Sequence, residues 1–169
     1  MGSGSGTTRT VCTRRRLLAT GGSALAVSIA GCLGGADQAS AEPQFDVATS
    51  HLSPTCDCCE LHADYLASGG VDVDVVEHSN DELLAMKDDL GIPQDLRSCH
   101  TTELEAGYVI EGHVPVAVIN EVLEEQPDAE VIALPGMPAG SPGMPGSKDE
   151  EWVFYAIDED GEVSEFTRK

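Results

Sequence analysis

The chain has 169 residues, which is enough for one ordinary domain, and 41% of them are hydrophobic, which is enough for a core. Its 9 basic and 30 acidic residues give a formal net charge of -21. So acidic a surface repels a phosphate backbone, which argues against nucleic-acid binding. The acidity fits either a surface for basic partners or cations, or adaptation to high salt. We favour the second, a halophilic protein, because the acidic residues are scattered along surface-like positions.

The first 36 residues differ from the rest in composition. Every acidic residue follows Ala36, so the charge is +4 before this point and -25 after it. The stretch TRRRLLATGGSALAVSIAGC has a basic start, a mildly apolar middle and a small-residue end, and it is too short and too rich in Gly and Ala for a membrane span. Paired arginines before Leu17 and Leu18 resemble a twin-arginine (Tat) export signal. We therefore predict such a signal over residues 1–31.

The end of this signal, IAGC, resembles a lipobox, in which Cys32 becomes the lipidated first residue of a mature lipoprotein. This predicts an exported protein at the cell surface, anchored to the outer face of the cytoplasmic membrane by lipidated Cys32. Residues 32–44 are rich in Gly, Ala and Ser and predict a flexible tether, which leaves 45–169 as the folded domain. The alternative is a tail whose arginines are incidental.

Within the domain, predicted strands alternate with predicted helices. Alternating apolar and polar residues predict a strand over 45–50, alternating β-branched residues predict one over 71–78, and a short apolar segment predicts one over 107–112. Capping residues and the Gly and Pro that follow predict helices from the first cysteines to about Ser68, over 81–90 and over 114–127. A Gly/Pro/Met loop over 134–147 precedes a hairpin with its turn at Asp160-Gly161. The order β-α-β-α-β-α-β-β predicts an α/β fold with a mixed sheet.

Four cysteines follow the signal: Cys56, Cys58, Cys59 and Cys99. An even number in an exported protein suggests disulfides. Cys58 and Cys59 are adjacent, however, and a bridge between neighbours is strained, so the easy bridge runs from the cluster to Cys99 and leaves two thiols unexplained. A purely structural role is therefore the weaker interpretation.

Metal binding explains the cluster better. The dipole and free N–H groups at a helix start stabilise thiolates, and thiolates select soft ions, chiefly Cu(I), with Zn(II) as the competitor. Cys99 is followed by His100 on a polar loop that could fold over the cluster. The C-x-x-C spacing of Cys56 and Cys59 keeps a thiol-disulfide or copper oxidoreductase as the alternative.

Further soft or imidazole donors are weaker candidates. Met137 and Met144 lie in matched PGMP turns, where a thioether could capture Cu(I) or simply fill a gap. His62 and His113 could bind the metal or support another ligand, whereas His51 and His78 are assigned to ordinary hydrogen-bonded positions. No catalytic triad, phosphate-binding glycine loop or HExxH motif is present, so no catalytic residue is predicted.

Three segments, CDCCELH, SCHTTELEAGYVIEGHVP and ALPGMPAGSPGM, together resemble the exported metal-binding family called domain of unknown function 411 (DUF411), which includes CopG-like copper-resistance proteins. The resemblance covers about residues 45–169. It implies a thioredoxin-like core and copper bound by the CxCC thiols with the later Cys-His pair. The ligands it implies are Cys56, Cys58, Cys59, Cys99 and His100. Asp57 stands where the family typically has Gly.

The sequence thus predicts an extracytoplasmic copper-binding protein that serves copper resistance or homeostasis. Four thiolates are expected to hold Cu(I), with more than one ion balancing their charge better than a single ion. The predicted partners are copper ions, copper exporters or other copper-handling proteins, and the membrane through the lipid anchor.

Overall fold

The computed structural model of the chain describes residues 41–169. The predicted export signal and Cys32 lie outside the described residues. The last residues of the predicted tether are hydrogen-bonded to the third helix: Gln44 N donates to Asn120 Oδ1 at 2.9 Å, and Asn120 Nδ2 donates to the carbonyl of Glu42 at 2.8 Å. No helix within 41–169 is long and apolar enough to cross a bilayer.

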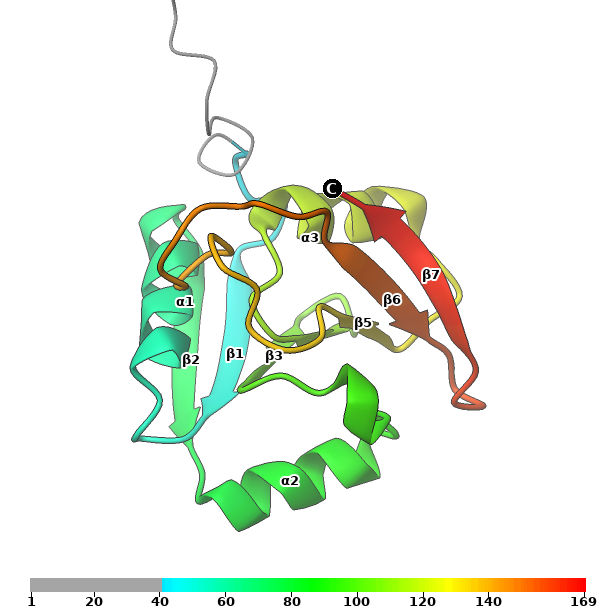
Figure 1. The fold of residues 1–169 in the computed structure, drawn as a ribbon, viewed down its shortest axis with the longest axis horizontal. Helices are drawn as coiled ribbons and strands as arrows, with labels where there is room; N and C mark the ends of the chain where they lie inside the picture. Colours follow the sequence, from blue (N-terminus) through cyan, green and yellow to red (C-terminus); the bar gives the residue numbers. More distant parts are fainter. Residues whose placement is uncertain (1–40) are drawn as a thin grey trace, which may run out of the picture. The chain divides into compact units, whose positions relative to one another are not determined.

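A seven-stranded mixed sheet runs through the domain in the order β2-β1-β3-β4-β5-β6-β7 (Figure 1). The pairs β1/β2 and β4/β5 are parallel, and the other neighbours are antiparallel. The strands are β1 (Val47–Leu52), β2 (Asp72–Glu77), β3 (Thr101–Leu104), β4 (Val109–Glu111), β5 (Val131–Ala133), β6 (Val153–Ile157) and β7 (Val163–Arg168). The predicted α/β class with a mixed sheet is confirmed.

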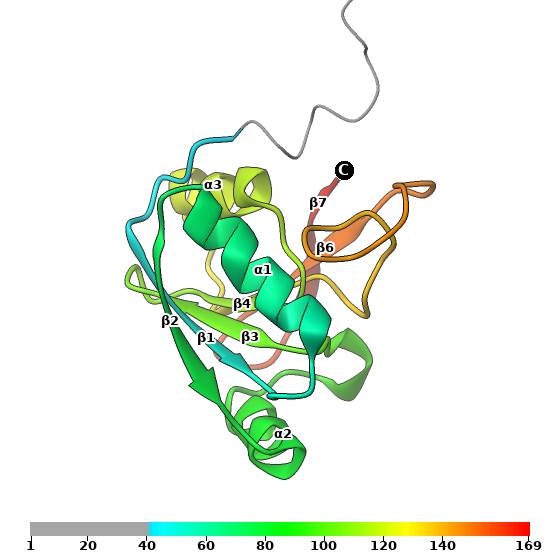
Figure 2. The same cartoon turned by 90° about the vertical axis from the view of Figure 1, so that its left-hand side faces the viewer.

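Residues 41–169 also form three α-helices and a short 3-10 helix, η1 (Gln94–Leu96). The first and third α-helices pack against the sheet, and the second lies beyond the ends of β1 and β2 (Figure 2). The helices are α1 (Asp57–Ser68), α2 (Asn80–Asp89) and α3 (Val116–Glu125). Ser79 begins α2 with a capping box, in which its hydroxyl accepts from Glu82 N while the Glu82 carboxylate accepts from Ser79 N.

Two apolar clusters form the core, one on each face of the sheet. Leu66 of α1 and Ile119 of α3 belong to the larger cluster together with Ile110 of β4. On the other face, Ile92 and Leu96 pack against Val109. Successive residues of a strand point to opposite faces, so Val109 and Ile110 serve different clusters. The burial of both faces fixes the register of the central strands.

Two strands of the structure, β3 and β5, were not predicted. The polar segment after Cys99 was expected to be a loop, which is wrong: it forms β3 in the middle of the sheet, and Thr101 and Thr102 are buried. Polar residues are tolerated there because each hydroxyl has a partner, Glu111 Oε2 for Thr101 and Ser50 Oγ for Thr102.

The predicted terminal hairpin is confirmed as β6 and β7. Its turn spans Asp158 to Gly161, one residue earlier than expected.

Candidate metal centre

The cysteine cluster occupies the first turn of α1. Cys56 is the N-cap residue, Cys58 is partly buried and Cys59 is fully buried. A disulfide joins Cys56 to Cys59, whose Cα atoms are 5.3 Å apart, within the normal range for disulfides. The structure therefore closes the bridge inside the cluster and not, as the sequence suggested, between the cluster and Cys99. Cys58 and Cys99 remain free.

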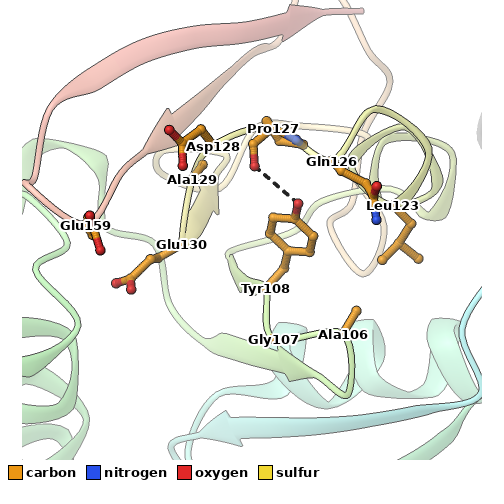
Figure 3. A pocket seen from close by; sticks show the side chains of 10 residues that line it. All are labelled: Ala106, Gly107, Tyr108, Leu123, Gln126, Pro127, Asp128, Ala129, Glu130 and Glu159. Carbon is orange, nitrogen blue, oxygen red and sulfur yellow. Dashed lines mark hydrogen bonds between the residues drawn. The ribbon is translucent and has the colours of Figure 1, made fainter.

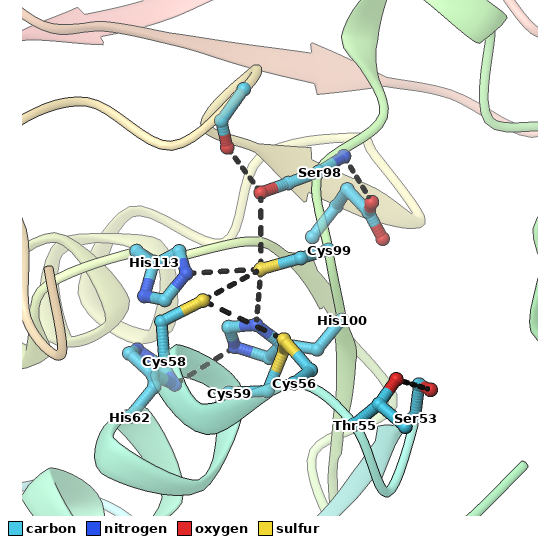
Figure 4. Close-up of a disulfide and its surroundings, with 12 residues drawn as sticks. Ser53, Thr55, Cys56, Cys58, Cys59, His62, Ser98, Cys99, His100 and His113 are labelled. Atoms are coloured by element: carbon cyan, nitrogen blue, oxygen red, sulfur yellow. Dashed lines mark hydrogen bonds between the residues drawn. A yellow bond between two sulfur atoms is a disulfide. The ribbon is translucent and has the colours of Figure 1, made fainter. Parts of the chain in front are cut away.

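All four predicted thiol ligands meet at this turn (Figure 4). Cys58 Sγ lies 3.5 Å from Cys56 Sγ and 3.9 Å from Cys99 Sγ, and all four sulfur atoms lie within 4.8 Å of one another. Cys99 reaches them from the segment that leads into β3. Because a thiolate and not a disulfide sulfur is the strong metal ligand, all four can bind only when the Cys56–Cys59 bridge is open.

Three histidines, His62, His100 and His113, lie beside the sulfur atoms (Figure 4). His62 Nε2 donates to the carbonyl of Val114 at 3.1 Å, and His113 Nδ1 donates to the carbonyl of Pro142 at 2.7 Å. A carbonyl can only accept, so these bonds fix which nitrogen of each neutral ring carries the hydrogen. His62 Nδ1 must then accept from His100 Nε2, 3.0 Å away.

These fixed hydrogens leave two bare nitrogens aimed at one sulfur. His100 Nδ1 lies 3.4 Å and His113 Nε2 lies 3.0 Å from Cys99 Sγ. A neutral thiol has a single hydrogen and can satisfy only one of the two nitrogens. A metal ion bound by the sulfur and both nitrogens would satisfy all three. The structure thus brings predicted ligand His100 to the cluster and places His113 beside it, while His62 holds His100 in orientation.

Burial keeps these rings neutral. Desolvation lowers the pKa of His62 to about 4, with a further contribution from nearby His113. Desolvation also lowers the pKa of His100 well below its ordinary value, and it lowers the pKa of His113. Neutral imidazole is the metal-binding form. Burial, followed by the nearby Cys58, raises the pKa of Cys99 to about 12, so Cys99 is a thiol at neutral pH until a cation displaces its proton.

Comparisons with known proteins identify the family of the chain. The family model described as "Protein of unknown function, DUF411" matches residues 96–144. Two solved structures, titled "Copper resistance protein copG" in form 1 and form 2, are each 32% identical to the chain and cover 75% of it, with TM-scores of 0.63 and 0.64. The chain in turn covers 98% and 99% of those two chains. The chain belongs to the DUF411 family of CopG-like proteins. No curated protein sequence matches it.

In this DUF411 protein a buried ion pair supports the segment that carries Cys99. Lys87 Nζ donates to Glu111 Oε1 at 2.5 Å, and both side chains are at most 2% exposed. Lys87 also donates to the carbonyl of Ser98 at 2.8 Å, while Glu111 accepts from Ser98 N at 2.6 Å. The pair therefore holds both sides of Ser98, next to Cys99. Sequence reasoning missed these two residues, although a carboxylate inside the apolar segment GYVIEG was a signal that could have indicated Glu111.

The loop with the two methionines passes over the cluster. A Cβ at Gly143 would lie 2.8 Å from the carbonyl oxygen of Cys58 and 2.9 Å from His62 N, and the φ of Gly143 is +83°, so only glycine fits this approach. Met144 follows Gly143 directly. Met137, which is 52% exposed, follows Gly136, whose carbonyl accepts a hydrogen bond from Ser98 Oγ. Each thioether is thus adjacent to a residue that contacts the site, and their role as ligands stays a prediction.

A surface pocket of about 380 Å³ lies elsewhere, around Tyr108 and Pro127 (Figure 3). Tyr108 donates to the carbonyl of Pro127 at 3.2 Å, and Asp128, Glu130 and Glu159 also line the pocket. None of its lining residues is a predicted ligand.

Proposed function

We propose that this protein binds copper as Cu(I) and serves copper resistance or homeostasis. The observation that carries the proposal is the convergence of Cys99 Sγ with two unprotonated imidazole nitrogens, directly beside the free thiol of Cys58. Thiolate and imidazole donors together suit copper, and thiolates favour its cuprous state. The relatives titled copper resistance proteins support the same role.

The number of available donors depends on the disulfide. With the Cys56–Cys59 bridge open, four thiolates and the nitrogens of His100 and His113 surround one small volume, which suits more than one Cu(I) ion. With the bridge closed, the remaining donors are Cys58, Cys99, His100 and His113. Several cuprous ions balance the charge of four thiolates better than one ion does.

Copper titration of the reduced chain tests the proposal. The full chain is isolated and reduced without oxygen, then titrated with Cu(I) against a chromophoric Cu(I) chelator, with Zn(II) as the competing ion. We expect more than one Cu(I) per chain and displacement of Zn(II) by Cu(I). A Cu(I) stoichiometry of zero, with tight Zn(II) binding instead, would contradict the proposal.

We further propose that the protein works on the outer face of the cytoplasmic membrane, anchored by lipidated Cys32 and exchanging copper with exporters or other copper-handling proteins. The arginine-rich start and the IAGC segment support this location. Cys32→Ala should then move the exported protein from the membrane fraction to the soluble fraction. An unchanged membrane fraction would argue against this anchor.

The Cys56–Cys59 disulfide favours a second candidate function, copper or thiol-disulfide oxidoreduction. Closing this bridge from two thiols releases two protons and two electrons, enough to reduce two Cu(II) ions to two Cu(I) ions. The metal-free reduced chain should then reduce Cu(II) or an insulin-type disulfide, and Cys56→Ser should abolish this activity. Reduction at an unchanged rate by Cys56→Ser would reject the role of this pair.

A further inference from the structure

A second pair of histidines lies apart from the thiol cluster. His51 Nδ1 is 2.9 Å from His78 Nε2, and the ring centroids are 5.1 Å apart with 39° between the ring planes. We propose that His51 and His78 form a separate site for a divalent imidazole-binding ion, with Cu(II) bound most tightly. The sequence alone assigned both residues to ordinary positions.

The sheet brings the two residues together. β1 and β2 are parallel, with His51 opposite Val76, and His78 N extends the pairing by donating to the carbonyl of Leu52 at 2.9 Å. Both strands end on the side of the domain where α2 lies (Figure 2). The pair is therefore built into adjacent strand ends, and both rings are only partly buried, which leaves room for water or a further ligand on the ion.

A carboxylate lies behind one of the rings. Glu103 Oε1, on β3, is 3.7 Å from His51 Nε2, a nitrogen that is buried and has no hydrogen-bond partner among the described residues. A carboxylate on this side favours hydrogen on Nε2, which leaves Nδ1 bare and facing His78. Metal-binding histidines commonly have this arrangement, with a carboxylate opposite the coordinating nitrogen.

The separation of the two nitrogens suits a single ion. Without metal, one hydrogen is shared between His51 Nδ1 and His78 Nε2. Two nitrogens bound cis to a tetragonal Cu(II) at about 2.0–2.1 Å lie roughly 2.9 Å apart, so rotation of the rings and loss of that hydrogen would let both bind one ion. The exposed residue Glu77, directly before His78 in the chain, adds negative charge that favours a cation.

This pair differs chemically from the thiol cluster. It offers imidazole nitrogen and carboxylate oxygen without sulfur, which suits Cu(II), Ni(II) or Zn(II) better than Cu(I). Cu(II) should bind most tightly in that series. The inference does not depend on the proposed Cu(I) site, and either can fail alone.

Cu(II) binding to the full chain with its free thiols alkylated and the disulfide closed tests the site. We expect one Cu(II) per chain, with an electron paramagnetic resonance spectrum of a tetragonal ion coupled to two nitrogens. His51→Gln and His78→Gln should each weaken binding at least tenfold, and Glu103→Gln should weaken it by about tenfold. His113→Gln, a matched histidine change in the other cluster, should keep this Cu(II).

The same measurements can overturn the inference. Absence of a bound Cu(II), its retention in both His51→Gln and His78→Gln, or its loss in His113→Gln would each reject the pair as the site. The unsubstituted chain gives a check that is free of folding defects, because paramagnetic Cu(II) should broaden the imidazole NMR signals of His51 and His78 first. Earlier broadening of the His100 or His113 signals would reject the proposal as well.

Discussion

The five histidines of this chain form two groups that differ in how their hydrogens are fixed. His62, His100 and His113 are fully buried, and two backbone carbonyls determine which nitrogen of each ring is bare. His51 and His78 lie at strand ends, contact no thiol among the described residues, and share one hydrogen between them.

The two groups offer the same side chain in different surroundings. In the buried group, two backbone carbonyls and the ring of His62 hold the bare nitrogens toward Cys99, and the donors include sulfur. At the strand ends, only one carboxylate biases one ring, and the donors are nitrogen and oxygen. We therefore expect Cu(I) in the first group and Cu(II) in the second.

The largest effect should come from the ion pair that holds the Cys99 segment. Lys87→Met leaves the carboxylate of Glu111 buried without its cation, which should lower the free energy of unfolding by about 3–5 kcal/mol. Denaturant unfolding measures this change. Asp88→Asn removes the surface ion pair with Arg97 and should cost less than about 1 kcal/mol. Equal losses of unfolding free energy in both variants would show that the buried ion pair stabilises the fold no more than the surface pair does.

Acidification should destabilise the buried group next. The unfolded chain protonates His62 as the pH falls through 6.5, whereas the folded chain resists until about pH 4. The folded pKa is the lower one, so stability falls with falling pH across this window, by about 3 kcal/mol for His62 between pH 7 and pH 4. His62→Gln should flatten the dependence of unfolding free energy on pH. An unchanged slope would show that His62 is not held neutral.

A smaller effect should separate the two groups in copper affinity. His113→Gln removes one bare nitrogen from the buried donors and should weaken Cu(I) binding to the reduced chain by about 10–100-fold. His78→Gln should leave Cu(I) affinity unchanged, because that ring lies in the other group. Competition with a Cu(I) chelator measures both. Equal losses of Cu(I) affinity in the two variants would show that the two histidine groups do not differ in Cu(I) binding.

The smallest effect concerns the stability of the metal-free chain. His78 is partly exposed, and its described side-chain hydrogen bond is to His51. His78→Gln should therefore change the unfolding free energy by no more than about 0.5 kcal/mol. Thermal unfolding without metal measures this, and a loss above about 2 kcal/mol would show that the pair is a structural contact that the core requires.

The sequence predicted the α/β class and placed the three α-helices within about two residues of their observed bounds, because capping residues, glycines and alternating β-branched residues act locally. It did not predict the short helix η1. It did not predict β3, since Thr101 and Thr102 look like loop residues until Ser50 and Glu111 supply their partners. Those partners come from other strands, so the local sequence does not indicate that the two hydroxyls are hydrogen-bonded.

The candidate site was predictable only where local sequence motifs carry its residues. The CxCC motif and the Cys99-His100 pair stand out in sequence, and the structure brings them together. The roles of His62 and His113 could not be assigned, because they depend on the carbonyls of Val114 and Pro142 in distant segments. The proximity of His51 and His78 depends on the register of a parallel strand pair, which no local pattern indicates.

The most direct test of the central claim is the Cu(I) affinity of Cys99→Ser, because Cys99 is the donor shared by the thiol cluster and the bare histidine nitrogens. Reduced wild-type and Cys99→Ser chains are titrated with Cu(I) without oxygen, and folding of the variant is checked by circular dichroism. We predict more than one Cu(I) per wild-type chain, and in the folded variant fewer bound ions and an affinity at least about tenfold weaker. The same stoichiometry and affinity in both chains would contradict the account.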